Sequence, residues 1–317
     1  SVTLYPRGIP TEMIVDDNFP CYSWGKALFT SPKGNEIWVM LLEKAYCKYY
    51  KSFASAEAGS PTDAFEYVHG CPGQTFFCDK FQENEIWEML KDFDSRNFMV
   101  TCSSKDGLSK EATGIVSGHA YTIISAHDVE GKHLLKIRNP WGNQEWNGDY
   151  SDKSSKWTDS LKRACNFVDA EDGSFFMTVH DFIGHFGSYD VAYYHDNFVY
   201  SYITATFNPT MHKFFEFSLP SKTKAYLRCH FEDKRCHTPD GSKEPSDGYK
   251  YSQCFMTLCK KLEGGRLEKV NEPHNNQHWG GRSVHLHKDM MIELEKGDYL
   301  LKVVVNWYDD EPHECVL

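Results

Sequence analysis

The hydrophobic pattern of this 317-residue chain changes from a helical period to a strand period partway along its length. Apolar residues recur at helical spacing over 37–46, with Asn35 as the predicted N-cap, and again over roughly 83–94. From about residue 190 most segments alternate like strands, as in KFFEFSL (213–219), AYLRCHF (225–231), CFMTLCKKL (254–262) and DYLLKVVVNW (298–307). Helices and antiparallel strands in separate stretches predict the α+β class, with an antiparallel β-sandwich at the C-terminal end.

The length predicts more than one domain, because a single hydrophobic core rarely grows to this size. The first helical pattern is followed by a break at Gly59, Ser60 and Pro61, and strands dominate after about residue 190. We therefore expect three segments, covering residues 1–60, 61–190 and 191–317.

Charge and cysteine usage exclude several classes of protein. The formal net charge is −11, which repels a phosphate backbone, so nucleic acid is not expected as a partner. No apolar stretch reaches the ~20 residues of a membrane span, and the first residues contain no signal-peptide segment, so we expect no intrinsic membrane association. Eleven cysteines, an odd number without a CxxC pair, indicate reduced thiols and a cytoplasmic location.

Two strand patterns, AYTIISA (120–126) and HLLKIRN (133–139), flank the polar segment HDVEG (127–131) and predict an antiparallel hairpin. If the loop is that whole segment, His119 faces Asn139 directly, with β-carbons ~5 Å apart. A slip of one residue would send the two side chains to opposite faces of the sheet.

This pair has the chemistry of a cysteine protease. An imidazole that a neutral amide orients can accept the proton of a cysteine thiol and form a thiolate–imidazolium pair. Pro140 ends the strand, and the indole of Trp141 can shield the hydrogen bond between His119 and Asn139 from water. Such a histidine and asparagine also occur as ordinary core and turn residues, so the pair by itself leaves a structural role open.

Several motifs around the pair occur in the order known from one protease family. They are Gly-His-Ala-Tyr (118–121), Arg-Asn-Pro-Trp-Gly (138–142), Glu-Trp (145–146) and Gly-Asp-Tyr (148–150), with Val-Asp-Asp (15–17) and Leu-Leu-Glu-Lys-Ala-Tyr (41–46) upstream and Glu-Asp-Gly (171–173) downstream. Over roughly residues 10–190 the sequence resembles the calpains, which are calcium-dependent cysteine proteases.

The resemblance implies a partial papain-like protease core. Residues 1–60 would be the end of the nucleophile subdomain and 61–190 the complete His/Asn subdomain, while 191–317 resembles the calpain β-sandwich domain more weakly. The resemblance further implies that His119 is the general base, Asn139 its orienting partner and Trp141 the residue packed over them.

The nucleophile of the family is missing from this sequence. Calpains carry it in a segment with a glutamine and a Cys-Trp pair ahead of the Val-Asp-Asp motif, and none of the eleven cysteines here is followed by tryptophan. Because His119, Asn139 and Trp141 are all retained, we expect the thiol to come from sequence absent from this chain. The rival interpretation is a catalytically inactive pseudoprotease that acts as a binding or regulatory module, and a papain-like transferase is a third.

The expected reaction is hydrolysis of peptide bonds in intracellular proteins through an acyl-enzyme. The expected partners are protein or peptide substrates, together with an N-terminal protease subdomain or a regulatory subunit.

The resemblance also implies calcium as a cofactor. In calpains an ion in this subdomain is held by carboxylates at the positions of Glu145, Asp152 and Asp172 and by the carbonyl oxygen at the position of Ala170. A further glutamate of the family is replaced here by Ser174, which removes up to two ligand oxygens. A solvated acidic surface without metal is the alternative.

A second potential metal site lies in the strand-rich part of the chain. Cys229-His230 and Cys236-His237 supply four side chains of the types that bind zinc. Neighbouring residues of a strand point to opposite faces, which disfavours a single tetrahedral site. No EF-hand loop follows in the sequence.

Overall fold

The computed structural model describes residues 1–31, 34–208, 212–238, 249–271, 283–286, 290–307 and 313–317. These residues divide into two compact units. We call residues 60–65 and 71–196 the hairpin unit, and residues 1–59, 66–70 and 197–317 the terminal unit, because the latter contains both chain ends. None of the helices among the described residues is long and apolar enough to cross a membrane.

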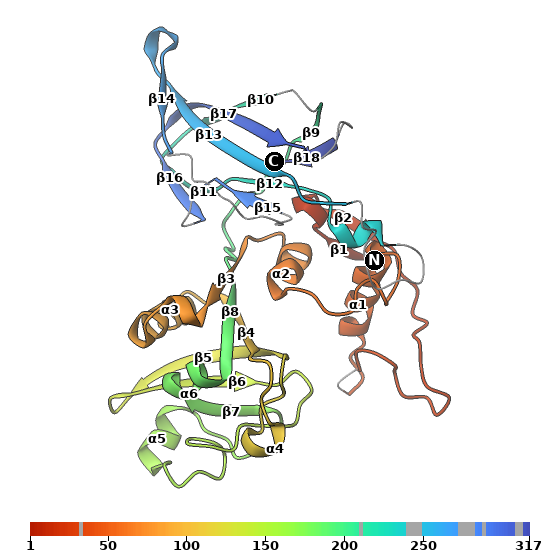
Figure 1. The fold of residues 1–317 in the computed structure, drawn as a ribbon, viewed down its shortest axis with the longest axis vertical. Helices are drawn as coiled ribbons and strands as arrows, with labels where there is room; N and C mark the ends of the chain where they lie inside the picture. Colours follow the sequence, from red (N-terminus) through yellow and green to blue (C-terminus); the bar gives the residue numbers. More distant parts are fainter. Residues whose placement is uncertain (32–33, 209–211, 239–248, 272–282, 287–289, 308–312) are drawn as a thin grey trace. The chain divides into compact units, whose positions relative to one another are not determined.

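The hairpin unit is built on a six-stranded antiparallel sheet with the order β3-β8-β4-β5-β6-β7 (Figure 1). Its strands are β3 (Gly73–Phe77), β4 (Met99–Ser104), β5 (Ala120–Val129), β6 (Lys132–Arg138), β7 (Ser174–Thr178) and β8 (Phe186–Ala192). Its helices are α3 (Glu83–Ser95), α4 (Lys110–Thr113), α5 (Asp159–Ala164) and α6 (Val179–His185), with a 3₁₀ turn η2 (Cys78–Lys80). Helix α2 (Pro61–His69) contributes residues to both units.

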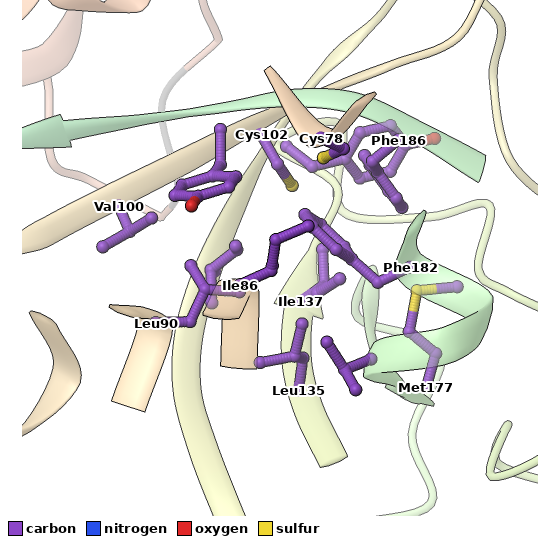
Figure 2. Close-up of a cluster of buried hydrophobic side chains, with 14 of the residues drawn as sticks. Cys78, Ile86, Leu90, Val100, Cys102, Leu135, Ile137, Met177, Phe182 and Phe186 are labelled. Atoms are coloured by element: carbon purple, nitrogen blue, oxygen red, sulfur yellow. The ribbon is translucent and has the colours of Figure 1, made fainter. Parts of the chain in front are cut away.

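Helix α3 forms where its sequence pattern predicts it, and its N-terminus is capped. The backbone N–H of Gln82 donates to a carboxylate oxygen of Glu85 at 2.8 Å. Its apolar face is buried against the sheet, and Figure 2 shows Ile86 and Leu90 in one cluster with Leu135 and Ile137 of β6. This core supports the β5–β6 hairpin.

The predicted loop of that hairpin is wrong. The structure has a two-residue turn at Glu130 and Gly131, both with positive φ (52° and 72°), as a type I′ turn requires. Residues 127–129, predicted to lie in the loop, instead belong to β5 and pair with β6. A short turn whose twist matches that of the strands extends the ladder to the turn itself.

The terminal unit contains two four-stranded antiparallel sheets, with the orders β10-β17-β13-β14 and β15-β12-β18-β9, and a separate pair β11-β16. Their bounds are β9 (Thr204–Phe207), β10 (Lys213–Leu219), β11 (Thr223–Tyr226), β12 (Arg228–His230), β13 (Gln253–Lys261), β14 (Leu267–Lys269), β15 (Ser283–His285), β16 (Met291–Leu294), β17 (Gly297–Asn306) and β18 (His313–Val316). One hydrophobic core draws residues from both large sheets, such as Phe207 and Val303. Antiparallel sheets in the C-terminal part are therefore as predicted, although the segment 225–231 is divided between β11 and β12.

The N-terminal part of the terminal unit contains the β1 (Val2–Leu4) and β2 (Thr11–Met13) pair, the 3₁₀ turn η1 (Pro6–Gly8) and helix α1 (Trp38–Tyr49). The 3₁₀ turns η3 (Lys234–His237) and η4 (Glu263–Gly265) complete the unit. The hydroxyl of Tyr50, just after α1, donates to buried Asp233 at 3.1 Å. This contact helps to explain why residues 1–59 group with the C-terminal sheets. The three predicted segments, divided at residues 60 and 190, stay a prediction.

The N-cap predicted for α1 is wrong. Ile37, not Asn35, is the residue before the first helical turn, and no side chain caps the helix. Ile37 and Trp38, predicted to belong to a core stripe, are 42% and 60% exposed. The buried positions are Met40, Ala45 and Cys47.

Candidate active site

The side chains of His119 and Asn139 are in contact. The imidazole Nε2 lies 3.0 Å from the amide Oδ1 of Asn139, which is fully buried. The amide nitrogen of Asn139 donates to the backbone carbonyls of Asn143 (2.7 Å) and Gln144 (3.2 Å). These two acceptors fix the orientation of the amide, because only its NH₂ group can donate to them.

That orientation determines the tautomer of His119. Since Oδ1 of Asn139 can only accept, the proton of a neutral imidazole must be on Nε2. Nδ1 then carries the lone pair, and in the part of the chain that the structure describes it has no hydrogen-bond partner. The ring is half-buried, so Nδ1 is a base available to an incoming proton donor.

Two aromatic side chains flank the imidazole. The centroid of the Trp141 ring lies 4.3 Å from that of His119, and Tyr121 packs edge-on with a centroid distance of 4.9 Å. Trp141 is placed over the histidine as predicted, but it remains 56% exposed, so it covers one side of the ring only. Its backbone N–H also donates to Oδ1 of Asn139 at 3.1 Å.

A β-bulge at Ile124 brings the pair to one face of the sheet. Close to the turn Val129 faces Lys132, and this register would place residues 119 and 139 on opposite faces if it continued. The register shifts by one between Ile123 and Ser125, after which Ile123 faces Ile137. Extended beyond the strands, the new register places residue 119 opposite residue 141, with residue 139 as its diagonal neighbour on the same face. The predicted direct pairing of His119 with Asn139 is therefore wrong, although the two side chains do meet.

Gly173, the last residue of the Glu-Asp-Gly motif, packs closely against the backbone of Asn139, a role that the sequence did not indicate. The N–H of Asn139 donates to the carbonyl of Gly173 at 2.8 Å. Gly173 has φ +85°, and a Cβ at this position would lie 2.7 Å from the carbonyl oxygen of Asn139. Positive φ and close approach of two backbones are the two conditions under which glycine is needed.

Several buried cysteines of this chain have electrostatics opposite to those of a nucleophile. Burial raises the pKa of Cys47 to about 12 and those of Cys78 and Cys236 to about 11. The pKa of Cys102 is also raised by burial, well above its ordinary value. A nucleophilic cysteine needs the opposite shift, toward the thiolate.

Thiol labelling tests whether the buried cysteines are unreactive. Cys21 is the one exposed cysteine of the eleven. We expect a disulfide reagent such as DTNB to modify one thiol rapidly in the native chain and the others only as the protein opens. Substitution Cys21→Ser should remove the rapid phase; a rapid phase that persists would reveal a second, activated thiol.

The predicted calcium residues converge on the loop 170–173. One oxygen of Glu145 accepts the N–H groups of Asp172 (3.0 Å) and Gly173 (2.7 Å), and Asp152 accepts the N–H of Ala170 at 3.1 Å. Desolvation raises the pKa values of Glu145 and Asp152, and neighbouring carboxylates raise them further. The N–H of Ser174 donates to Asp172 at 2.8 Å and lowers the pKa of that carboxyl.

As placed, these carboxylates bind backbone N–H groups. Among the described residues, no group of three or more histidine, cysteine, aspartate or glutamate side chains is positioned to hold a metal ion. The residues therefore share a loop without forming a ligand set for calcium, and the same holds for the Cys-His pairs considered for zinc. The thiol of Cys229 instead contacts Cys254 and Cys315, which with burial raise its pKa, and His237 stacks on Tyr249 at 4.0 Å.

Comparison with known proteins identifies relatives of the N-terminal part of the chain. The family model described as "Calpain family cysteine protease" matches residues 1–193. Calpain-type cysteine protease DEK1 of Arabidopsis thaliana is 37% identical over 193 residues, which cover 57% of this chain and 9% of the relative. Calpain-type cysteine protease ADL1 of rice is 38% identical with the same coverage, and human calpain-9 is 32% identical over 193 residues, 57% of this chain and 28% of the relative. The chain thus spans less than a third of the length of each of these relatives.

Proposed function

The chain belongs to the calpain family of cysteine proteases, and on this premise we propose that it carries the histidine–asparagine half of a calpain-type endopeptidase. The observation that carries the proposal is the contact of His119 with Asn139, which leaves the basic Nδ1 without a partner among the described residues. The nucleophilic thiol is supplied by protein outside this sequence. The substrates are other proteins, and the location is the cytoplasm.

In the proposed reaction His119 moves protons and Asn139 keeps its ring in place. Nδ1 takes the proton of the thiol, and the thiolate attacks the peptide carbonyl. The imidazolium then returns its proton to the leaving amine, which leaves an acyl-enzyme. In the second half His119 takes a proton from water, the hydroxide adds to the thioester carbonyl, and the C–S bond breaks to release the carboxylic acid product and regenerate the thiolate–imidazolium pair.

The two antiparallel sheets that share a core are proposed to form the calpain-type β-sandwich. Its proposed role is that of a scaffold or regulatory domain that interacts with an N-terminal protease subdomain or a regulatory subunit. Neither membrane nor nucleic acid is a proposed partner.

The test is complementation. The nucleophile-bearing segment of a relative such as calpain-9 is joined to or mixed with the full chain, and hydrolysis of casein is measured; we call this the complemented protein. We expect hydrolysis that iodoacetamide blocks and that neither part shows alone. A folded complex without hydrolysis would contradict the proposal.

The rival function is that of an inactive binding module. It is favoured by the raised pKa values of the buried cysteines, none of which can replace the missing nucleophile. If the complemented protein binds unfolded casein but does not cut it, this second function is the better description.

Calcium does not enter the proposed steps, because the residues that match the family site do not form a ligand set here. We expect calorimetric titration of the chain with CaCl₂ to show no site with a Kd below about 1 mM, the weak limit of calcium sites in proteins. Substitution Ser174→Glu restores a carboxylate and should tighten binding about ten-fold or more. Micromolar binding by the unmodified chain that Asp172→Asn removes would show that the loop rearranges around the ion.

A further inference from the structure

His119 lies just before a strand, in a segment that hydrogen bonds from other segments hold in place; the N–H of Gly118, for example, donates to the carbonyl of Lys105 at 3.3 Å. His119 precedes the first residue of β5, and it follows Gly118, which has φ +59°. A glycine next to the proposed base gives the backbone freedom to turn, because no side chain restricts its conformation. The backbone of His119 itself is held by hydrogen bonds from outside β5.

Ser104, the last residue of β4, holds the backbone of His119 through both its backbone N–H and its side-chain hydroxyl. Its backbone N–H donates to the carbonyl of His119 at 3.0 Å, and the N–H of His119 donates to the hydroxyl Oγ of Ser104 at 2.9 Å. In a regular antiparallel pair the second bond would end on a backbone carbonyl. The serine side chain thus replaces a ladder acceptor at a place where β4 is irregular, since the β4–β8 register shifts between Ser103 and Ser104.

The same hydroxyl ties down the segment that leads to His119. Its proton is donated to the carbonyl of Val116 at 2.6 Å, with the carbonyl of His119 as a second, longer acceptor at 3.2 Å, and the residue is 7% exposed. One buried hydroxyl therefore accepts from His119 and donates to Val116. Removing it would leave both backbone groups without this partner, which costs more than the bonds themselves gain.

We propose that Ser104 is a positioning residue for His119, in that its hydroxyl fixes the backbone from which the imidazole reaches Asn139. The proposal rests on the proposed function for its catalytic meaning. The imidazole is held by one hydrogen bond of 3.0 Å, and a backbone shift of about 1 Å is enough to break such a bond. Asn139 orients the imidazole ring, whereas Ser104 fixes the position of the backbone that carries it.

The first experiment uses NMR on the full chain with Ser104→Ala. We expect hydrogen exchange of the His119 amide to become about ten-fold faster or more, while the Tyr121 amide is unchanged. We also expect the resonance of the His119 ring Nε2–H to broaden, because the ring loses its fixed contact with Asn139. Ser104→Thr keeps the hydroxyl and should restore both signals.

Ser103→Ala is the matched control. It removes a hydroxyl from the preceding residue of β4, which has no side-chain hydrogen bond in the described structure, and should change neither signal. Circular dichroism verifies that all variants fold. If Ser104→Ala speeds amide exchange but leaves the ring Nε2–H unchanged, Ser104 supports the loop only and the positioning role is refuted.

The second experiment measures turnover of the complemented protein. Ser104→Ala should lower kcat about 100-fold with KM little changed, as expected for a misplaced catalytic group. A wild-type kcat in the variant would refute the positioning role while leaving the assignment of His119 intact. If the complemented wild type itself is inactive, the proposed function fails, and the NMR result still decides whether Ser104 holds the ring.

Discussion

Replacement of His119 by alanine is expected to lower the kcat of the complemented protein by about 10⁴-fold or more. Three proton transfers in the proposed reaction pass through this imidazole, and its Nδ1 is the basic atom that the site leaves available. The aromatic neighbours Trp141 and Tyr121 cannot take over, since an indole has no basic nitrogen and a phenol is a weak base near neutral pH. Initial rates of casein hydrolysis measure the effect.

His180→Ala is the control for this substitution. His180 belongs to the same unit but is exposed. Its Nδ1 lies 3.0 Å from a carboxylate oxygen of Glu83, and neither residue is part of the candidate site. The variant should retain wild-type turnover. Activity that His119→Ala leaves intact would overturn the assignment of the base, even if the complemented protein is a genuine protease.

Deletion of Ile124 is expected to abolish the contact between His119 and Asn139 and to destabilise the hairpin unit by more than about 4 kcal/mol. Strand β5 pairs with β4 on one side and with β6 on the other, so loss of the bulge forces one of these registers to slip. A slip of one residue would turn Tyr121 and Ile123, which are buried, toward the opposite face. Urea unfolding gives the free energy, and the His119 Nε2–H resonance reports the contact.

Ile124→Ala separates the bulge from the side chain that occupies it. The isoleucine is 43% exposed, so truncation that keeps the extra residue should cost about 1 kcal/mol or less. If deletion proves as mild as this substitution, the bulge does not control the register, and the face that His119 occupies must be determined by β4 alone.

Elements with a strong local signal were predicted well. The apolar period of α3 locates the helix to within one residue at its C-terminal end, and the alternation of KFFEFSL coincides with β10. The predicted burial of Ile37 and Trp38 near α1 was wrong for a physical reason. Both residues fit a helical stripe, but their exposure depends on what packs beside them. Helical period specifies which residues share a face and not whether that face is covered.

In the candidate site, too, the sequence predicted the types of side chain but not how they are brought together. Imidazole, carboxamide and indole in one short stretch of sequence predicted the chemistry, and the structure places these groups in contact. The route by which they meet was not predictable, because a two-residue turn at Glu130 and a bulge at Ile124 change the register twice. Ser104 carried no sequence signal at all, since a serine that replaces a backbone acceptor resembles any other serine in a strand.

Thus the order of residues by itself determined the α+β class, most strands, the family and the kinds of groups available for proton transfer, because these depend on local period and side-chain chemistry. Only the tertiary structure decided which groups touch: that His119 exposes Nδ1 and not Nε2, that Glu145 and Asp152 accept backbone N–H groups of loop 170–173, and that a serine holds the histidine. These outcomes depend on strand register and backbone path, where a displacement of one residue reverses a face and no single residue type signals the shift.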